Sequence, residues 1–243
     1  MRNCKLWSVF NKLHVLAILI VFCSLQANAV VNTEKTRLIF NADDNIVDLY
    51  LSNSEKQPTL VQAWIDDGDM LASPESIQTP IIITPPVFTM KPNEIRSIRL
   101  ILASRTALAK DRETIYWLNI YQIPPSNETV NRVTQKMVLP LRIRMKVFVR
   151  PSGIGELQEQ SVKQVDFKLQ NVAGKTTLLI TNPTPWHINL NQIVISGEKI
   201  DNMMLIPKSS QTITLQDSTK SYDRLDYSVI NDLGTNWQYH IKL

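Results

Sequence analysis

Few side chains in this sequence could carry out catalysis, and none is spaced for it. Beyond the first thirty residues the only histidines are His187 and His240, and neither has Cys, His or carboxylate neighbours at the spacing of a zinc or copper site. We expect both to be strand residues with ordinary hydrogen bonds. There is no G-x-S-x-G nucleophile turn, and no helix signal follows the SGIG run at 152–155, as a phosphate-binding loop would need. The sequence therefore predicts no enzyme, no metal and no cofactor.

Two acidic pairs, Asp43-Asp44 and Asp66-Asp67, are the remaining candidates for cation binding. A calcium loop supplies several oxygen ligands at regular spacing, and neither pair has them. Both pairs fall in turn-like sequence. We therefore expect solvated turns at these positions.

Binding chemistry is better represented, in the segment that ends at Pro151. Five alternate residues there are apolar and would share one face of a β-strand: Met137, Leu139, Leu141, Ile143 and Met145. The other face carries three cations, Arg142, Arg144 and Lys146. Pro140 has no N–H to donate, and prolines inside strands belong at edges or bulges. An apolar edge strand of this kind indicates pairing with another chain, although the alternation also fits the inner face of a sandwich.

Short β-strands bounded by turn residues account for almost all of the remaining sequence. In the first part we expect them at Thr36–Phe40, Ile46–Leu51, Thr59–Ile65, Ile81–Thr84, Arg96–Leu102, Thr114–Ile123 and in the strand ending near Val149. In the second part we expect them at Gln164–Gln170, Thr176–Thr181, His187–Ser196, Gln211–Leu215, Leu225–Asn231 and Trp237–Leu243. The single helical candidate is Ser104–Ala109.

A break in this strand pattern at Pro151–Gly155 predicts two domains. Two of the six glycines lie there beside a proline, which suits a hinge. The number of strands on each side is typical of immunoglobulin-like sandwiches. We therefore expect an all-β protein with two immunoglobulin-like β-sandwich domains, residues 30–151 and 152–243, joined by that hinge.

Residues 1–29 have the features of a cleavable secretory signal, with three basic residues before residue 13, an apolar run over 15–25 and an A-x-A ending at Ala29. The run is shorter than the roughly 20 apolar residues that span a bilayer, so we expect export without membrane insertion. Cleavage after Ala29 would remove both cysteines and leave 23 Lys and Arg against 22 Asp and Glu. That balance does not support a nucleic-acid surface, and the lack of cysteines excludes a disulfide-stapled scaffold.

The segment Leu108–Pro125, LAKDRETIYWLNIYQIPP, resembles the signature segment of the PapD-like periplasmic chaperones that assemble pili by the chaperone–usher route. Six other segments resemble landmarks of that family in the same order: TRLIF at 36–40, LVQAWIDD at 60–67, TPPVFTMKPNE at 84–94, MKVFVRP at 145–151, TNPTPWHI at 181–188 and VINDLG at 229–234. The resemblance covers essentially the whole chain after the signal.

This resemblance implies two sandwiches in an L or boomerang arrangement and a binding function. Members of the family donate the last strand of their first domain to a pilus subunit whose own fold lacks a strand, and they deliver the subunit to an outer-membrane usher. By position, the implied groove-filling side chains are Met137, Leu139, Leu141 and Ile143. Arg37 and Lys146 match the cleft pair that holds the subunit's C-terminal carboxylate.

An inter-domain ionic triad of the family is matched by Glu113, Arg150 and Asp232. It would fix the angle between the two sandwiches.

Two features depart from the strand geometry that this resemblance implies. Lys146 is out of phase with the apolar residues 137–143 in an ideal strand, so we expect a bulge or strong twist between them. Pro140 removes one donor, so either a bond to the subunit is missing or the ladder breaks there.

One alternative is an exported structural or adhesin-like sandwich protein, although after Ala29 the chain has no cysteine pair and runs directly into a strand, where a donor arm would be expected. The segment between Pro125 and Met137 also lacks the cysteine pair of the long-loop branch of the family, which favours the short F1–G1 loop branch. We further expect weak self-association through the edge strand, because a bare apolar edge is prone to pairing.

Overall fold

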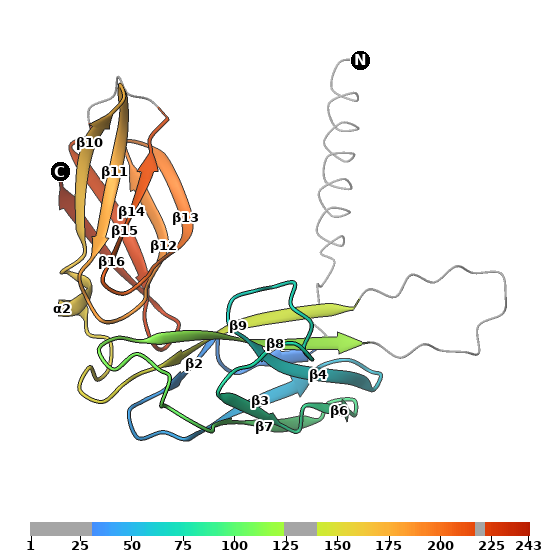
Figure 1. The fold of residues 1–243 in the computed structure, drawn as a ribbon. Helices are drawn as coiled ribbons and strands as arrows, with labels where there is room; N and C mark the ends of the chain where they lie inside the picture. Colours follow the sequence, from blue (N-terminus) through green and yellow to red (C-terminus); the bar gives the residue numbers. More distant parts are fainter. Residues whose placement is uncertain (1–30, 124–139, 217–221) are drawn as a thin grey trace, which may run out of the picture.

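The computed structural model describes residues 31–123, 140–216 and 222–243, which are mostly β-strand. They form two β-sandwiches, as the sequence predicts. In Figure 1 the strands of the N-terminal sandwich run roughly horizontally, and the C-terminal sandwich stands upright at one end of them. The two sandwiches therefore enclose an angle. The L-shaped arrangement expected from the resemblance is therefore confirmed.

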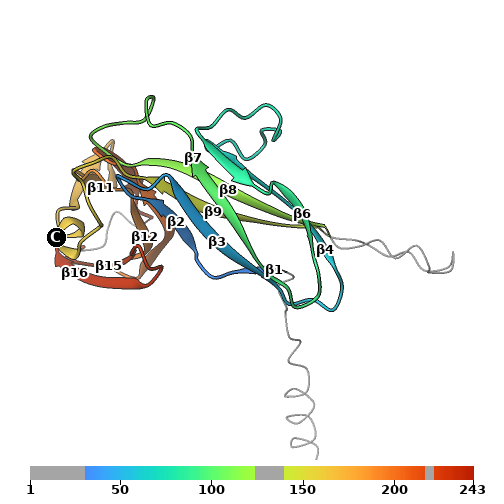
Figure 2. The ribbon, with the colours of Figure 1, turned by 90° about the horizontal axis from the view of Figure 1, so that it is seen from below.

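Among the described residues, nine strands in two sheets build the N-terminal sandwich. They are β1 (Val31–Thr33), β2 (Arg37–Phe40), β3 (Ile46–Asn53), β4 (Thr59–Asp66), β5 (Ile81–Thr84), β6 (Val87–Met90), β7 (Ile95–Leu102), β8 (Thr114–Ile123) and β9 (Leu141–Val149). One sheet has the order β1-β3-β7-β5 and the other β2-β9-β8-β4-β6. Seen from below, β3 and β7 cross in front of β8 and β9, which shows the two layers (Figure 2).

Alternating apolar residues fill the space between these sheets. In β3, Leu49 and Leu51 are fully buried, whereas Tyr50 between them is 49% exposed. Leu118 of β8 and Val147 of β9 supply buried side chains from the opposite sheet. The period of two thus places one face of each strand in the core, where burial of apolar surface stabilises the fold.

The strand β9 carries the candidate site, and its two halves have different neighbours. β8 pairs with it antiparallel over its whole length, from Gln122 opposite Leu141 to Thr114 opposite Val149. β2 runs parallel on its other side but covers only Lys146–Val149. Within residues 31–123, 140–216 and 222–243, Leu141–Met145 therefore has a neighbour on one side only. We call this segment the open half of β9, because its free backbone groups can pair with another strand.

The C-terminal sandwich is smaller and follows a short helix, α2 (Glu159–Val162). Its strands are β10 (Asp166–Val172), β11 (Lys175–Asn182), β12 (Ile188–Ile195), β13 (Glu198–Leu205), β14 (Ser209–Thr214), β15 (Arg224–Ile230) and β16 (Asn236–Lys242). They form the sheets β10-β11-β14 and β13-β12-β15-β16. Phe167, Leu178, Ile193 and Val229 are among the buried residues between them.

The structure corrects some of the expected elements. Residues 104–109 form a turn and not a helix. The strands β1, β6 and β13 and the helix α2 were not predicted. β1 and β6 are very short, and β13 (EKIDNMML) lacks a clear apolar alternation because its side chains are mostly exposed or half-buried.

Candidate binding cleft between the domains

Arg37 and Lys146 are brought together by the parallel pairing of β2 with β9, in which they are register partners. Arg37 is 8% exposed, and its Nη1 donates to the carbonyl oxygen of Ile230 in the C-terminal sandwich at 3.2 Å. Its Nε is buried and has no hydrogen-bond acceptor among the described residues. Lys146 Nζ donates to Oδ1 of Asn189, which also belongs to the C-terminal sandwich. The pair therefore lies where the two domains meet.

No carboxylate lies within 4.0 Å of either cation in the part of the chain that the structure describes. Burial disfavours the charged ammonium and, together with the nearby Arg37 charge, lowers the pKa of Lys146 to about 8. Burial also lowers the pKa of Arg37, although the charges of Asp232 and Glu113 oppose this. Two partly desolvated cations without a counter-ion form a site that can accept an anion such as a carboxylate.

Glu113, Arg150 and Asp232 also lie together. Arg150 Nε donates to Glu113 Oε1 at 2.7 Å, and its two Nη atoms donate to the two Asp232 oxygens at 2.8 Å each. Burial alone would lower the pKa of Arg150, but the hydrogen bonds and charges of Asp232 and Glu113 outweigh it and raise the pKa. Glu113 and Arg150 belong to the N-terminal sandwich and Asp232 to the C-terminal one. We call this cluster the triad. It is an ionic contact across the domain junction in which the arginine already binds two carboxylates.

His187 is a member of this junction that the sequence reasoning missed. It precedes β12 and is 5% exposed, and its backbone N–H and Nδ1 lie 2.9 Å and 3.1 Å from Glu113 Oε2. Its ring packs against Phe148 with centroids 5.6 Å apart. The sequence predicted an ordinary hydrogen bond for this histidine but not that the bond would connect the two domains. The only signal in the sequence was its position in the TNPTPWHI segment.

The open half of β9 presents part of the predicted apolar row. Leu141 is 42% exposed, Ile143 is partly buried against the core and Met145 is 4% exposed. Met137 and Leu139 lie outside the described residues, as does the loop between residues 125 and 137 on which the short-loop assignment depends. The apolar row is therefore the inner face of the sandwich at Met145 and is exposed at Leu141.

The sequence led us to expect a bulge or a strong twist between this row and Lys146, and in the described part, from Leu141 onward, there is no bulge. The register of β9 against β8 is unbroken from Leu141 to Val149, so Lys146 lies on the opposite face from Leu141 and Ile143. A bulge is unnecessary because a strand added beside β9 would continue both faces of the sheet at once. Pro140 immediately precedes the ladder, which begins at Leu141, so it removes no donor from the described pairing.

Asp66 was predicted to lie in a solvated turn, and this was wrong. It ends β4 with 0% exposure. Arg144 reaches its Oδ1 at 2.5 Å and Asn119 donates to its Oδ2 at 2.7 Å. The burial of Asp66 could not be predicted from the sequence, because its partners lie on β8 and β9 and reach it only when these strands pair with one another and with β4.

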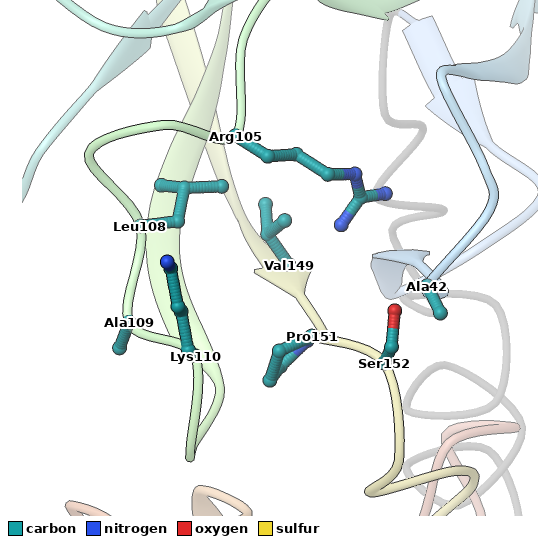
Figure 3. Close-up of a pocket in the computed structure, with 8 residues that line it drawn as sticks. All are labelled: Ala42, Arg105, Leu108, Ala109, Lys110, Val149, Pro151 and Ser152. Atoms are coloured by element: carbon teal, nitrogen blue, oxygen red, sulfur yellow. The ribbon is translucent and has the colours of Figure 1, made fainter.

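A separate pocket of about 280 Å³ lies where β9 ends and the chain continues through Pro151 and Ser152, and Figure 3 shows the residues that line it. Its main polar group, Arg105, donates to the carbonyl oxygens of Asn41, Asp44 and Arg150 at 2.6, 2.7 and 3.0 Å. The guanidinium therefore ties the β2–β3 turn to the end of β9. The pocket is a junction of loops and does not include Arg37 or Lys146.

The parts of the chain that the structure describes contain neither a candidate metal-ion cluster nor a candidate membrane-spanning helix. In these ranges, no group of three or more His, Cys, Asp or Glu side chains could hold a metal ion. Among the same residues, no helix has the length and hydrophobicity needed to cross a membrane.

Two family models together match nearly the whole chain. The PapD N-terminal domain of pili and flagellar-assembly chaperones matches residues 30–155, and the C-terminal domain of the pili assembly chaperone PapD matches residues 160–241. The chain belongs to this family of pilus-assembly chaperones, whose fimbrial members are periplasmic.

Individual relatives agree with this assignment. Chaperone protein MrkB of Klebsiella pneumoniae is 35% identical over 219 residues, which cover 88% of this chain and 91% of that protein. The crystal structure of the YadV chaperone matches with a TM-score of 0.72 and 27% identity over 88% of this chain and 100% of its own. The SafB chaperone, solved in complex with the Salmonella enterica SafA pilin, matches with a TM-score of 0.75 and 25% identity over 90% and 99% of the two chains. These relatives support a chaperone and not the structural or adhesin-like alternative.

Proposed function

We propose that this chaperone captures a pilus subunit by adding a strand along the open half of β9, while Arg37 and Lys146 hold the subunit's C-terminal carboxylate. The observation that carries the proposal is the pair of partly buried cations, which have no carboxylate partner among the described residues and lie where the open half of β9 ends. A carboxylate bound there would receive charge-assisted hydrogen bonds, and the backbone groups of the open half would receive a ladder.

The apolar row supplies the main attraction in this scheme. Burying a large apolar side chain contributes about 1.5–3 kcal/mol, so Met137, Leu139, Leu141 and Ile143 together would contribute on the order of 6–12 kcal/mol before ordering costs. An ion pair in water contributes only about 0–1 kcal/mol, and charge-assisted bonds in the partly desolvated cleft contribute about 1.5–3 kcal/mol. We therefore assign affinity mainly to the row and register mainly to the carboxylate, since one fixed end decides which side chain meets which part of the subunit.

The remaining parts of the proposal concern export and delivery. Residues 1–29 direct secretion and are cleaved after Ala29, the chain works in the periplasm without catalysing a reaction, and it passes its subunit to an outer-membrane usher. Residues 30–151 form the subunit-binding domain and residues 152–243 the second domain. The triad holds the angle between them, and the free protein associates weakly with itself through the open half of β9.

Co-expression with a pilus subunit encoded beside the gene, followed by size-exclusion chromatography of the periplasmic extract, tests the capture. We expect a one-to-one complex that is lost in Lys146→Ala. Lys168→Ala is the matched control, because Lys168 is an exposed lysine of the second domain whose side chain is 66% accessible. A complex that survives Lys146→Ala would overturn the carboxylate anchor, and the absence of any complex would overturn subunit capture.

A further inference from the structure

Four cations lie on the outer face of the sheet β2-β9-β8-β4-β6, which is the face directed away from the core of the N-terminal sandwich. In one row, Asp66, Trp117, Lys146 and Arg37 are register partners across β4, β8, β9 and β2. In the next row Trp64 is opposite Asn119, which is opposite Arg144, and Arg142 follows one row further. Arg142 and Arg144 therefore belong to the same surface as the carboxylate anchor.

Arg142 and Arg144 differ from the anchor in that both lie within 4.0 Å of a carboxylate, that of Asp66. Arg144 donates to both oxygens of Asp66, at 2.5 and 3.2 Å, and its guanidinium lies 4.2 Å from the centre of the Trp117 ring. Arg142 donates twice to Asn119 Oδ1, at 2.6 and 2.9 Å, and once to the Met70 carbonyl at 2.9 Å. Asn119 in turn donates to Asp66. A single carboxylate thus organises both arginines.

Asp66 is held in its charged form by these contacts. Its burial opposes ionisation, but hydrogen bonds from Arg144, Asn119 and the Gly68 N–H outweigh burial and lower its pKa. Arg142 also lies 3.7 Å from its Oδ2. Among the described residues, the hydrogen-bond acceptors of Arg37 and Lys146 are by contrast neutral oxygens, the Ile230 carbonyl and the Asn189 amide. The surface therefore has two cations that share the charge of one carboxylate and two that have no carboxylate partner among the described residues.

We propose that Asp66 determines the register of subunit capture, because it occupies Arg144 and Arg142 and so leaves Arg37 and Lys146 as the cations available to a terminal carboxylate. The inference rests on the proposed function and adds a specificity-determining residue to it. Arg144 is two residues before Lys146 on the same strand and flanks the same Trp117 ring. A carboxylate bound to Arg144 would shift the added strand by about 7 Å without changing which face its side chains occupy.

Register is the readout that separates this role from a purely structural one. After its signal the chain has no cysteine, so Leu141→Cys gives one attachment point on the open half of β9. The probe is a synthetic peptide that copies the C-terminal strand of a pilus subunit, made with a free acid or an amide end and with a single cysteine moved along its length. Disulfide formation at each cysteine position reports the register, and fluorescence anisotropy reports the preference for acid over amide.

With Asp66 present, we expect cross-linking at one peptide position and an acid preference that Lys146→Ala abolishes. In Asp66→Asn we expect a second cross-linked position, two residues away, and an acid preference that persists in Asp66→Asn/Lys146→Ala. Adding Arg144→Gln should remove the second register. Asp48→Asn is the matched control, since Asp48 pairs with Arg99 at 3.2 Å on the other sheet.

A single register in Asp66→Asn would overturn the assignment, as would loss of the acid preference in Asp66→Asn/Lys146→Ala. If Asp66→Asn does not fold, Asp66→Asn/Arg144→Gln removes the unpaired guanidinium, and Arg144→Gln alone should keep the single register. Loss of the single register in Arg144→Gln would also overturn the assignment. Absence of an acid preference in the unsubstituted protein would instead overturn the proposed function on which it depends.

Discussion

The triad and the anchor each contain a cation from the same stretch of chain, and these two cations have opposite electrostatic surroundings. Lys146 lies in β9, and Arg150 follows the end of that strand four residues later. Arg150 is surrounded by Glu113 and Asp232 and donates to both at 2.7–2.8 Å. Lys146 and its register partner Arg37 have no carboxylate partner within the described chain, and burial lowers the pKa of both. The triad has the interactions needed to stabilise a fold, whereas the anchor leaves electrostatic free energy to be gained from a ligand.

The largest effect is expected from breaking the triad. Arg150→Met leaves Glu113 buried with only His187 beside it, and removing one partner of a buried ion pair costs about 3–5 kcal/mol. Urea denaturation should show this loss in the free energy of unfolding. Arg99→Met, at an exposed pair, should cost about 0–1 kcal/mol.

The double substitution Arg150→Met/Glu113→Leu extends the test, because it removes both charges of the buried pair and leaves only the third member of the triad, Asp232, whose side chain is 24% exposed. We expect it to recover much of the loss, since a buried pair can be replaced by apolar residues of similar size. A loss below about 1 kcal/mol in Arg150→Met alone would be inconsistent with a stabilising triad.

The next effect separates the open half of β9 from its buried continuation. Met145→Ala creates a cavity in the core and should lower the free energy of unfolding by about 2–5 kcal/mol. Leu141→Ala, at a residue 42% exposed, should change it by less than about 0.5 kcal/mol. Titration with a pilus subunit should show the larger effect for Leu141→Ala, whose affinity for the subunit should be about 10–100-fold weaker. If Leu141→Ala binds the subunit normally, the apolar row does not fill the groove.

A smaller effect on the fold is expected at the anchor. Lys146→Met removes a desolvated charge but also the donor to the buried Asn189 oxygen, and these opposing terms should keep the free energy of unfolding within about 1 kcal/mol. Capture of a subunit should nevertheless weaken about 10–100-fold, because charge-assisted bonds contribute about 1.5–3 kcal/mol. Lys146→Met would break the comparison if it destabilised the fold as strongly as Arg150→Met, because the anchor would then be a structural site.

A residue of these two sites could be predicted from the sequence if it lies in a segment with a recognisable local pattern, and not if only its contacts with other strands mark it. Arg37, Lys146 and the triad were found because each lies in a segment that resembles a family landmark. Asp66 and His187 were not, because their partners come from other strands and no local pattern encodes the alignment. The strand β13 could have been found from the Ser196-Gly197 pair, whose positive φ angles of 46° and 86° fit a two-residue hairpin. The buried alternation predicted most other strands within about two residues.

The finest distinction between the sites is their response to pH, because Lys146 titrates near pH 8 whereas arginine does not in this range. Unfolded Lys146 keeps its proton to about pH 10.4. Between about pH 8 and 10.4 the unfolded chain therefore binds more protons at this residue, and its contribution makes the folded protein more stable as pH rises. Capture should change in the opposite direction, since a carboxylate requires the charged ammonium.

We expect the affinity for a subunit to be constant below about pH 7 and to fall towards tenfold per pH unit above pH 8, until the pKa that Lys146 has in the complex is reached. Binding measured from pH 6.5 to 9.5 tests this, with Lys146→Arg as the control whose guanidinium stays charged. A fall of the same size in Lys146→Arg would show that another group controls the pH dependence. A flat profile in the unsubstituted protein would mean that capture does not depend on the charge of Lys146, and the contrast between the anchor and the triad would then be one of packing alone.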